Sequence, residues 1–135
     1  MGLFAGKRPA NLGAKEGRLK PCSWKPNCVN SMTDATADPV HGIAPLKISV
    51  QADSGWAALI GILKGRERVT LVTETPGYVH AEFKSSGMGF VDDVEFMLDA
   101  RAGVIHVRSA SRLGIRDFGV NRSRVESIRQ QFNKA

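Results

Sequence analysis

The chain has 135 residues, of which 42% are hydrophobic and 24% are charged, and it carries a formal net charge of +6. This balance excludes an intrinsically disordered chain and a membrane-embedded one, and the length suffices to bury a core without crosslinks. We therefore predict a single soluble domain over residues 1–135, with an irregular arm over residues 1–50 and regular elements over residues 53–135. No apolar run is long enough to cross a bilayer.

The basic residues are concentrated at the two ends of the chain. Residues 1–26 and residues 108–135 each carry a net charge of +5, whereas residues 27–107 carry −4. A basic protein attracts acidic partners in general. This distribution, however, lets part of the positive charge be neutralised within the molecule.

Residues 1–50 are rich in Gly, Pro, Asn, Ser and Asp and show no sustained periodicity before residues 45–50. Such a segment is typical of a long wrapping arm, here one that ends in a short strand. The first residues contain no apolar stretch of the kind found in secretory signals, which predicts a cytoplasmic location. A periplasmic location stays open if a leader has been removed.

Two cysteines, Cys22 and Cys28, lie in the proline-punctuated loop PCSWKPNC. Their spacing allows a small disulfide in an oxidising compartment, whereas two reduced thiols are expected in the cytosol, and both alternatives stay open. Zinc is disfavoured because there is no second cysteine pair and His41 is the only other nearby ligand. We predict no metal site in this loop and no cofactor for the chain.

A helical pattern begins at Ser54, the predicted N-cap, and ends at Gly65. Its apolar stripe is formed by residues at helical spacing, namely Trp56, Leu59, Ile60 and Leu63. Four short alternating runs follow, at residues 68–74, 77–83, 91–98 and 103–109. Their short connections make the pairing antiparallel.

A second helix closes the chain, with Asn121 as its predicted N-cap and Val125, Ile128 and Phe132 as its apolar stripe. The fold class is therefore α+β: a four-stranded antiparallel meander sheet with two helices on one face, preceded by the arm. The helices are expected to cover the apolar residues of the strands, which are Val79, Ala81, Phe83, Val94, Phe96, Leu98, Ile105 and Val107.

The opposite face of the sheet carries polar and ionisable side chains, because side chains two apart share a face. They include Tyr78, His80, Glu82, Lys84, Asp93, Glu95, Met97, Val104, His106 and Arg108. If Leu98 faces Gly103, Glu95 lies opposite His106 and Asp93 lies opposite Arg108, which pairs unlike charges. We expect a solvated, charge-paired face, since exposed ion pairs are more common on strands than ligand sites.

Asp92 has the parity of the apolar face, where a buried carboxylate needs a partner or becomes neutral. We predict that a donor between residues 108 and 124 binds Asp92, and that Arg108 pairs with Asp93. The basic stretch 108–132 then acts as a structural clamp, and only Arg129 and Lys134 are left as free basic surface. The members of the clamp are Asp92, Asp93, Arg108, Ser109, Ser111, Arg112, Asp117, Asn121, Arg122 and Arg124.

Four motifs resemble one known family over nearly the whole chain, from Asn11 to Arg129. These motifs are LGAKEGRLKPCSWKPNCVNS, DPVHGIAPL, GFVDDVEFMLD and GVIHVRSASRLGIRDFGVNRSRVESIR. They resemble the domain-of-unknown-function family 1499 (DUF1499), and the last two are long and specific. The resemblance implies a small domain found widely in bacteria and in some plastid-bearing eukaryotes. It implies no known activity and no catalytic residues. Ser23, Asn30 and Met32 depart from the family pattern in the cysteine loop.

Three functional hypotheses follow. The favoured one is a non-enzymatic binding or accessory domain, for a small molecule or a protein, with its site between the polar sheet face and the arm. The alternative is a metal-assisted or acid/base hydrolase that uses His80, Glu95 and His106 with Arg108 as an anion clamp. The third is weak nonspecific nucleic-acid binding through the last helix. Specific recognition is disfavoured because few aromatic side chains accompany the arginines.

Overall fold

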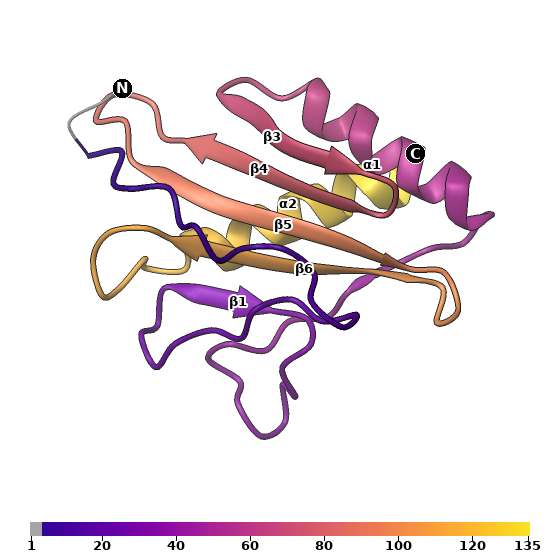
Figure 1. Cartoon of the computed structure of the whole chain (residues 1–135), viewed down its shortest axis with the longest axis horizontal. Coiled ribbons are helices and arrows are strands. Elements are labelled where there is room, and N and C mark those ends of the chain that lie inside the picture. The colour runs from indigo at the N-terminus through magenta and orange to yellow at the C-terminus, as the bar shows by residue number, and fades with distance from the viewer. Residues whose placement is uncertain (1–3) are drawn as a thin grey trace.

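In the computed structural model, which describes residues 4–135, the chain forms one sheet and two helices (Figure 1). The sheet order is β1-β6-β5-β4-β3, and β2 also pairs with β6. All neighbouring strands are antiparallel. In chain order the elements are β1 (Cys28–Asn30), β2 (Leu46–Lys47), α1 (Ala52–Lys64), β3 (Val69–Thr75), β4 (Tyr78–Lys84), β5 (Val91–Asp99), β6 (Val104–Ser111) and α2 (Val120–Lys134).

The α+β class and the antiparallel meander are confirmed, but the sheet has six strands and not four. The two additional strands, β1 and β2, come from the predicted irregular arm and lie along β6. They are three and two residues long. Strand β2 lies where the sequence predicted that the arm ends in a short strand, whereas β1 is too short to be recognised from alternation.

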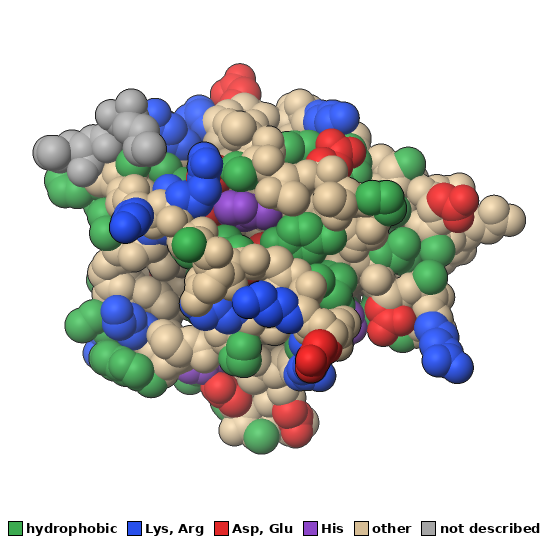
Figure 2. All heavy atoms as spheres, viewed as in Figure 1, with side chains coloured by type: hydrophobic (Ala, Val, Ile, Leu, Met, Phe, Trp, Pro, Cys, Tyr) green, Lys and Arg blue, Asp and Glu red, His purple; other side chains and the backbone are tan. Residues whose placement is uncertain are grey.

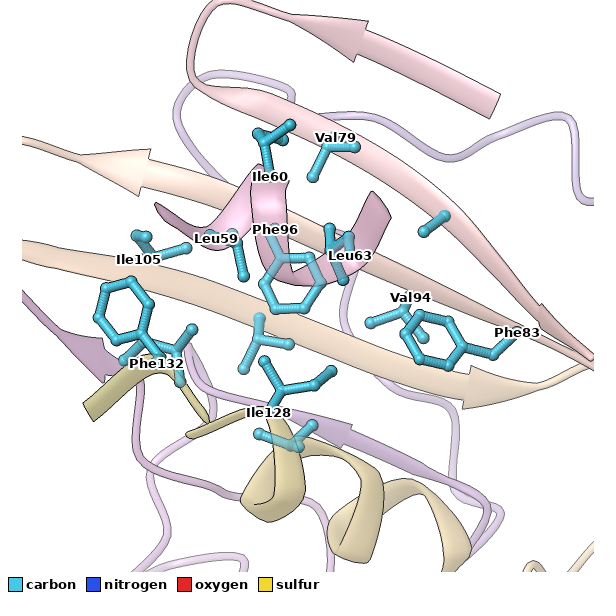
Figure 3. Packing of buried hydrophobic residues seen from close by; sticks show 14 of the residues in the cluster. Leu59, Ile60, Leu63, Val79, Phe83, Val94, Phe96, Ile105, Ile128 and Phe132 are labelled. Atoms are coloured by element: carbon cyan, nitrogen blue, oxygen red, sulfur yellow. The ribbon is translucent and has the colours of Figure 1, made fainter. Parts of the chain in front are cut away.

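The helices and the first part of the arm lie on opposite faces of the sheet. In Figure 1, α2 runs behind β5 and β6, while residues 4–20 cross in front of the strands. Figure 3 shows the interior between the helices and the sheet, where Phe96 lies among Leu59, Leu63 and Ile128. The predicted apolar face is confirmed, because its residues all belong to this core or pack against it.

The register between β5 and β6 differs from the predicted one by two residues. Leu98 pairs with Ile105 and not with Gly103, because the four-residue turn lies at residues 100–103 and not at residues 99–102 as the predicted pairing requires. Within this turn the backbone N–H of Ala102 donates to Asp99 Oδ1, at 3.0 Å, and Gly103 adopts a φ of 69°. A shift of two residues keeps every side chain on its predicted face and changes its partner across the strands.

Both helices begin earlier than predicted. Helix α1 starts at Ala52 with Gln51 as N-cap, so Ser54 lies inside the first turn. Helix α2 starts at Val120 with Gly119 as N-cap, so Asn121 is not the cap. Asp117 binds the first backbone groups of α2 instead, since its two carboxylate oxygens accept from the N–H groups of Gly119 and Asn121, at 2.9 and 3.0 Å.

Neither helix in residues 4–135 combines the length and the apolar character that a bilayer crossing requires.

Candidate functional site

The polar face of the sheet is buried and not solvated as the sequence had suggested. Glu95 is 0% exposed, Asp93 is 2% exposed and His80 is 4% exposed. The arm covers these side chains and binds them, since Gly13 N–H donates to Glu95 Oε2 at 2.9 Å and Arg8 Nε donates to Glu82 Oε2 at 2.5 Å. The arm therefore closes a layer of charged groups against the sheet.

Asp93 is the most fully bonded carboxylate of this layer. Arg112 binds it in a bidentate manner, with Nε 2.8 Å from Oδ2 and Nη2 2.8 Å from Oδ1, and His80 Nε2 lies 2.7 Å from Oδ1. Burial acts to raise the pKa of Asp93, but the hydrogen bonds from Arg112 and His80 outweigh it and lower that pKa. Arg112 Nη2 also donates to Glu82, so its guanidinium binds two carboxylates.

Glu95 receives its hydrogen bonds from Tyr78 and from the arm. The hydroxyl of Tyr78 donates to Glu95 Oε2 at 2.5 Å, and burial, together with this bond, raises the pKa of Tyr78. The other oxygen, Oε1, has no hydrogen-bond partner among residues 4–135. It lies 3.8 Å from Nη1 of Arg108, the residue opposite Glu95 in the observed register. That distance is too long for a hydrogen bond.

Arg108 was predicted to pair with Asp93, and the structure contradicts this. Because of the changed register, Asp93 lies opposite Ala110, and Arg112 and His80 bind it. Arg108 is only 7% exposed, and its Nε has no hydrogen-bond partner within residues 4–135. Burial lowers the pKa of Arg108, and the charge of Glu95 only partly offsets this. Arg108 is thus a buried cation with unused donors.

The guanidinium of Arg108 lines a cleft of about 210 Å³ between the arm, the cysteine loop and the end of β6. We call this cleft the anion pocket. Asp93 is the single carboxylate among its lining residues, and Arg112 already binds it. The other lining residues are Lys7, Pro9, Leu12, Lys20, Pro21, Ser23, Lys25, Asn27, Cys28, Ala110 and Ser111.

Figure 2 shows the face of the molecule on which the arm lies. Lysine and arginine side chains gather over its left half and centre, whereas acidic side chains lie mainly toward the upper, right and lower edges. Positive charge around a concave site focuses the field and attracts anions.

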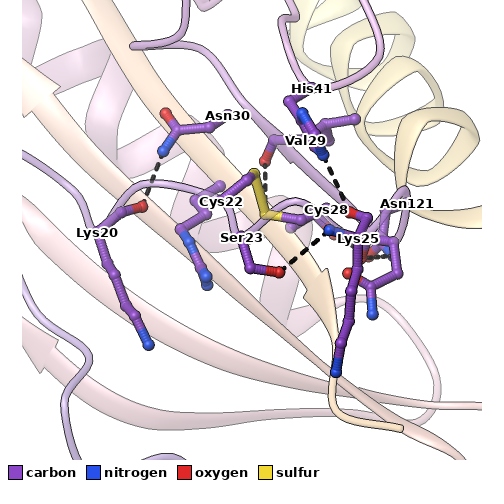
Figure 4. The surroundings of a disulfide bond; sticks show 12 residues. Lys20, Cys22, Ser23, Lys25, Cys28, Val29, Asn30, His41 and Asn121 are labelled. Atoms are coloured by element: carbon purple, nitrogen blue, oxygen red, sulfur yellow. Dashed lines mark hydrogen bonds between the residues drawn. A yellow bond between two sulfur atoms is a disulfide. The ribbon is translucent and has the colours of Figure 1, made fainter. Parts of the chain in front are cut away.

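The cysteine loop forms one wall of the anion pocket, and Cys22 and Cys28 are joined in it by a disulfide (Figure 4). His41 braces the loop, because its Nε2 lies 2.9 Å from the carbonyl oxygen of Lys25 and its Nδ1 lies 2.8 Å from Asp38 Oδ2. Burial acts to lower the pKa of His41, but Asp38 and the Lys25 carbonyl outweigh it and raise that pKa. His41 is therefore a structural bridge.

The three residues of the hydrolase hypothesis belong to separate hydrogen-bond sets. His80 binds Asp93, Glu95 binds Tyr78, and His106 Nδ1 lies 3.0 Å from Ser31 Oγ. His106 pairs with Met97 across the strands, and burial lowers the pKa of its ring. In residues 4–135, no group of three or more His, Cys, Asp or Glu side chains is arranged to hold a metal ion.

A family model described as a protein of unknown function (DUF1499) matches residues 18–132. The chain belongs to this family. No curated protein and no solved structure matches the chain at the significance applied. The match to DUF1499 thus covers nearly the whole chain, and the description of the family names no activity.

In this member of DUF1499, the partner of Asp92 is Arg124, which lies within the predicted range of residues 108–124. Arg124 Nη2 donates to Asp92 Oδ2 at 2.6 Å, and the same guanidinium lies 5.1 Å from the ring centre of Phe83. Arg124 Nη1 also donates to Asn121 Oδ1 at 2.7 Å. The remaining members of this buried set, joined through Asn121, are Ser109, Ser111 and Asp117.

Two further arginines of α2, Arg122 and Arg129, bind backbone carbonyl oxygens of residues 39–45. Arg122 Nη2 donates to the carbonyl oxygens of Pro39, Val40 and Gly42, at 3.1, 3.2 and 2.8 Å. Arg129, which was expected to be free basic surface, donates to the carbonyl oxygens of residues 44 and 45, at 2.7 and 2.6 Å. These hydrogen bonds occupy guanidinium donors of α2 that the sequence had left free for a partner.

Sequence analysis did not identify the lysines of the anion pocket, Lys7, Lys20 and Lys25. They lie in the aperiodic arm, where no pattern indicates the direction of a side chain. The signal that was present in the sequence is the net charge of +5 over residues 1–26.

Proposed function

We propose that the protein is a non-enzymatic binding domain for a small acidic molecule, with the anion pocket between the arm and the polar sheet face as its site. The observation that carries this proposal is the state of Arg108, which is buried and lines the pocket, and whose nearest carboxylate oxygen, Glu95 Oε1, is 3.8 Å from Nη1 and too distant for a hydrogen bond. A buried arginine with unused donors is costly to keep unless a ligand satisfies it.

The lysines around Arg108 favour a ligand with more than one negative charge. Lys20 Nζ donates to Asn11 Oδ1 at 3.2 Å, which fixes its amine at the rim. Lys7 and Lys25 add two further amines from different parts of the arm. An ammonium group binds phosphate or carboxylate as a point charge, whereas a guanidinium adds directed hydrogen bonds.

The size of the anion pocket sets an upper bound on the ligand. Its volume of about 210 Å³ is below the range of about 300–1,000 Å³ that is typical of sites for drug-sized molecules. The site therefore fits a compact anion, such as a phosphate ester or a dicarboxylate of a few carbon atoms. A nucleic-acid segment is too large for it.

The proposal is tested by titrating the protein with inorganic phosphate and with succinate in a calorimeter, at constant ionic strength. We expect saturable binding of at least one of the two anions by the unmodified chain. Arg108→Met is expected to weaken it at least about tenfold, because a charge-assisted hydrogen bond is worth about 1.5–3 kcal/mol. Arg101→Met is the matched control, since it removes the same charge at the exposed β5–β6 turn.

Two outcomes would overturn the proposal. One is the absence of saturable binding of either anion by the unmodified chain. The other is an equal loss of affinity in Arg108→Met and Arg101→Met, which would mean that only the overall charge attracts the anions.

A further inference from the structure

Two loops at one edge of the molecule expose large apolar side chains beside cations. Trp24, in the cysteine loop, is 73% exposed, while Ile115 and Phe118, in the segment between β6 and α2, are 53% and 92% exposed. Lys25 follows Trp24 directly, and Arg116, which is exposed, follows Ile115. We call these five residues the apolar-basic edge.

The two loops are held side by side by hydrogen bonds. Asn27 Nδ2 donates to the carbonyl oxygen of Gly114 at 2.9 Å, and the N–H of Ser111 donates to the carbonyl oxygen of Asn27 at 3.0 Å. Pro26 and Phe118 line the same shallow hollow. The cysteine loop and the segment between β6 and α2 therefore lie side by side, although they are about 90 residues apart in the chain.

Phe118 has an unfavourable backbone conformation. It has a φ of 53°, in the left-handed region that bulky side chains avoid, and the adjacent Gly119 has a φ of 80°. Asp117 fixes this conformation from beneath, because its carboxylate accepts from the N–H groups of Gly119 and Asn121. Packing of the Phe118 ring in the core does not offset the cost of this backbone conformation, since the side chain is 92% exposed.

The charges of the apolar-basic edge indicate the chemistry of the partner that it binds. Lys25 and Arg116 are cationic, and the nearest carboxylate in the sequence, Asp117, is bound inward by α2. Apolar side chains that project from loop tips beside cations suit the interface of a lipid bilayer, where the rings enter the headgroup region and the cations meet anionic headgroups.

We infer that the apolar-basic edge docks on the surface of an anionic lipid bilayer. The inference uses side chains other than the guanidinium of Arg108, and it does not require the anion pocket to be occupied. The cysteine loop belongs to both surfaces, however, so the anion pocket opens beside the docked edge.

The experiment uses the full chain with vesicles of phosphatidylcholine, with and without phosphatidylglycerol. We expect the protein to sediment with the anionic vesicles, and Trp24 emission to shift to shorter wavelength as its ring leaves water. Trp56, the second tryptophan, packs against the core and reports no such change. Phe118→Ser is expected to lower vesicle affinity about tenfold, because burying a phenylalanine contributes about 1.5–3 kcal/mol.

Val50→Ser is the matched control, because Val50 is 61% exposed and belongs to the segment that leads into α1, which Figure 1 shows at the opposite end of the sheet from the cysteine loop. Far-UV circular dichroism verifies that both variants are folded. The inference is overturned if anionic vesicles do not bind the chain, if Phe118→Ser and Val50→Ser bind alike, or if Trp24 emission does not shift. The last outcome points to a protein partner for the edge instead.

The outcomes for the two proposals are separable. If vesicle binding is absent and inorganic phosphate or succinate still binds, the docking inference fails and the binding function survives. If Arg108→Met loses the soluble anion and keeps vesicle binding, both proposals hold. If the unmodified chain binds vesicles and no soluble anion, the proposed function fails alone.

Discussion

The sheet is covered on both faces, by α1 and α2 on one side and by the arm on the other, and the side chains beneath the two covers differ in kind. Phe96, Val94 and Ile105 lie under the helices with 0% exposure, and Glu95 lies under the arm with the same exposure. The apolar face is stabilised by the area it removes from water. The polar face must instead satisfy each buried charge individually.

This difference predicts different responses to mutation. A core tolerates an apolar substitution in proportion to the cavity it creates. A network of buried charges responds to a single missing partner, because the remaining charge stays desolvated.

The largest effect is expected on the apolar face. Phe96→Ala removes a fully buried ring at the centre of the core and should lower the free energy of unfolding by about 4 kcal/mol. Urea denaturation measures this loss. A loss below about 1 kcal/mol would mean that the helices do not pack on this face as described.

A slightly smaller loss is expected on the polar face. Asp93→Asn removes the charge that Arg112 and His80 bind, and it should lower the free energy of unfolding by about 3 kcal/mol. Asp99→Asn is the control, because its side chain is 38% exposed and its turn hydrogen bond to Ala102 can persist. Equal stability of the two variants would contradict the view that charge pairing stabilises the polar face.

The polar face should also weaken in acid. The pKa of Glu82 is lowered, mainly by its hydrogen bond to Arg8, and the pKa of Asp93 is lowered as described above. A carboxyl whose pKa is depressed in the folded state stabilises it above the unfolded value, here 4.5 and 3.8, and the stabilisation is lost as the pH falls through the folded value. Denaturation midpoints measured from neutral pH to about pH 3 should fall, and less so in Asp93→Asn.

The smallest effect on stability is expected for Arg108, although it is buried like Arg112. Arg108→Met should lower the free energy of unfolding by about 1–2 kcal/mol, because it removes the cation 3.8 Å from the buried Glu95 carboxylate, whereas Nε forms no hydrogen bond within residues 4–135 and the apolar stem is retained. Arg112→Met, which loses two carboxylate partners, should cost about 3 kcal/mol. Similar losses in both variants would show that Arg108 is structural and would weaken the case for a ligand.

Residue periodicity predicted the two faces of the sheet correctly, because alternation in β4, β5 and β6 determines which side chains share a face. It could not reveal that the polar face is buried. The cover is the arm, whose contacts through Gly13 and Arg8 arise from a segment without periodicity. An alternating strand looks the same whether water or an irregular segment covers its polar side.

The partner of Arg108 was mispredicted for a different reason. The register depends on the position of the four-residue turn. Moving this turn by one residue, from 99–102 to 100–103, shifts the pairing by two residues and moves Asp93 from opposite Arg108 to opposite Ala110. The hydrophobic pattern is identical in both registers. The partner of Asp92, by contrast, required only that a donor from the chain terminus reach the core face, and Arg124 does so.

Strand β1 pairs with β6, which places Cys28 opposite Ala110. This pairing closes a long loop, which contains every element from β2 to β5. Closing so long a loop is slow compared with forming the hairpins of the meander, whose strands are neighbours in the chain. The meander from β3 to β6 is therefore expected to fold before the arm joins it. Because the anion pocket takes its walls from the arm and from β6, a nascent chain cannot complete this pocket before β6 has been synthesised.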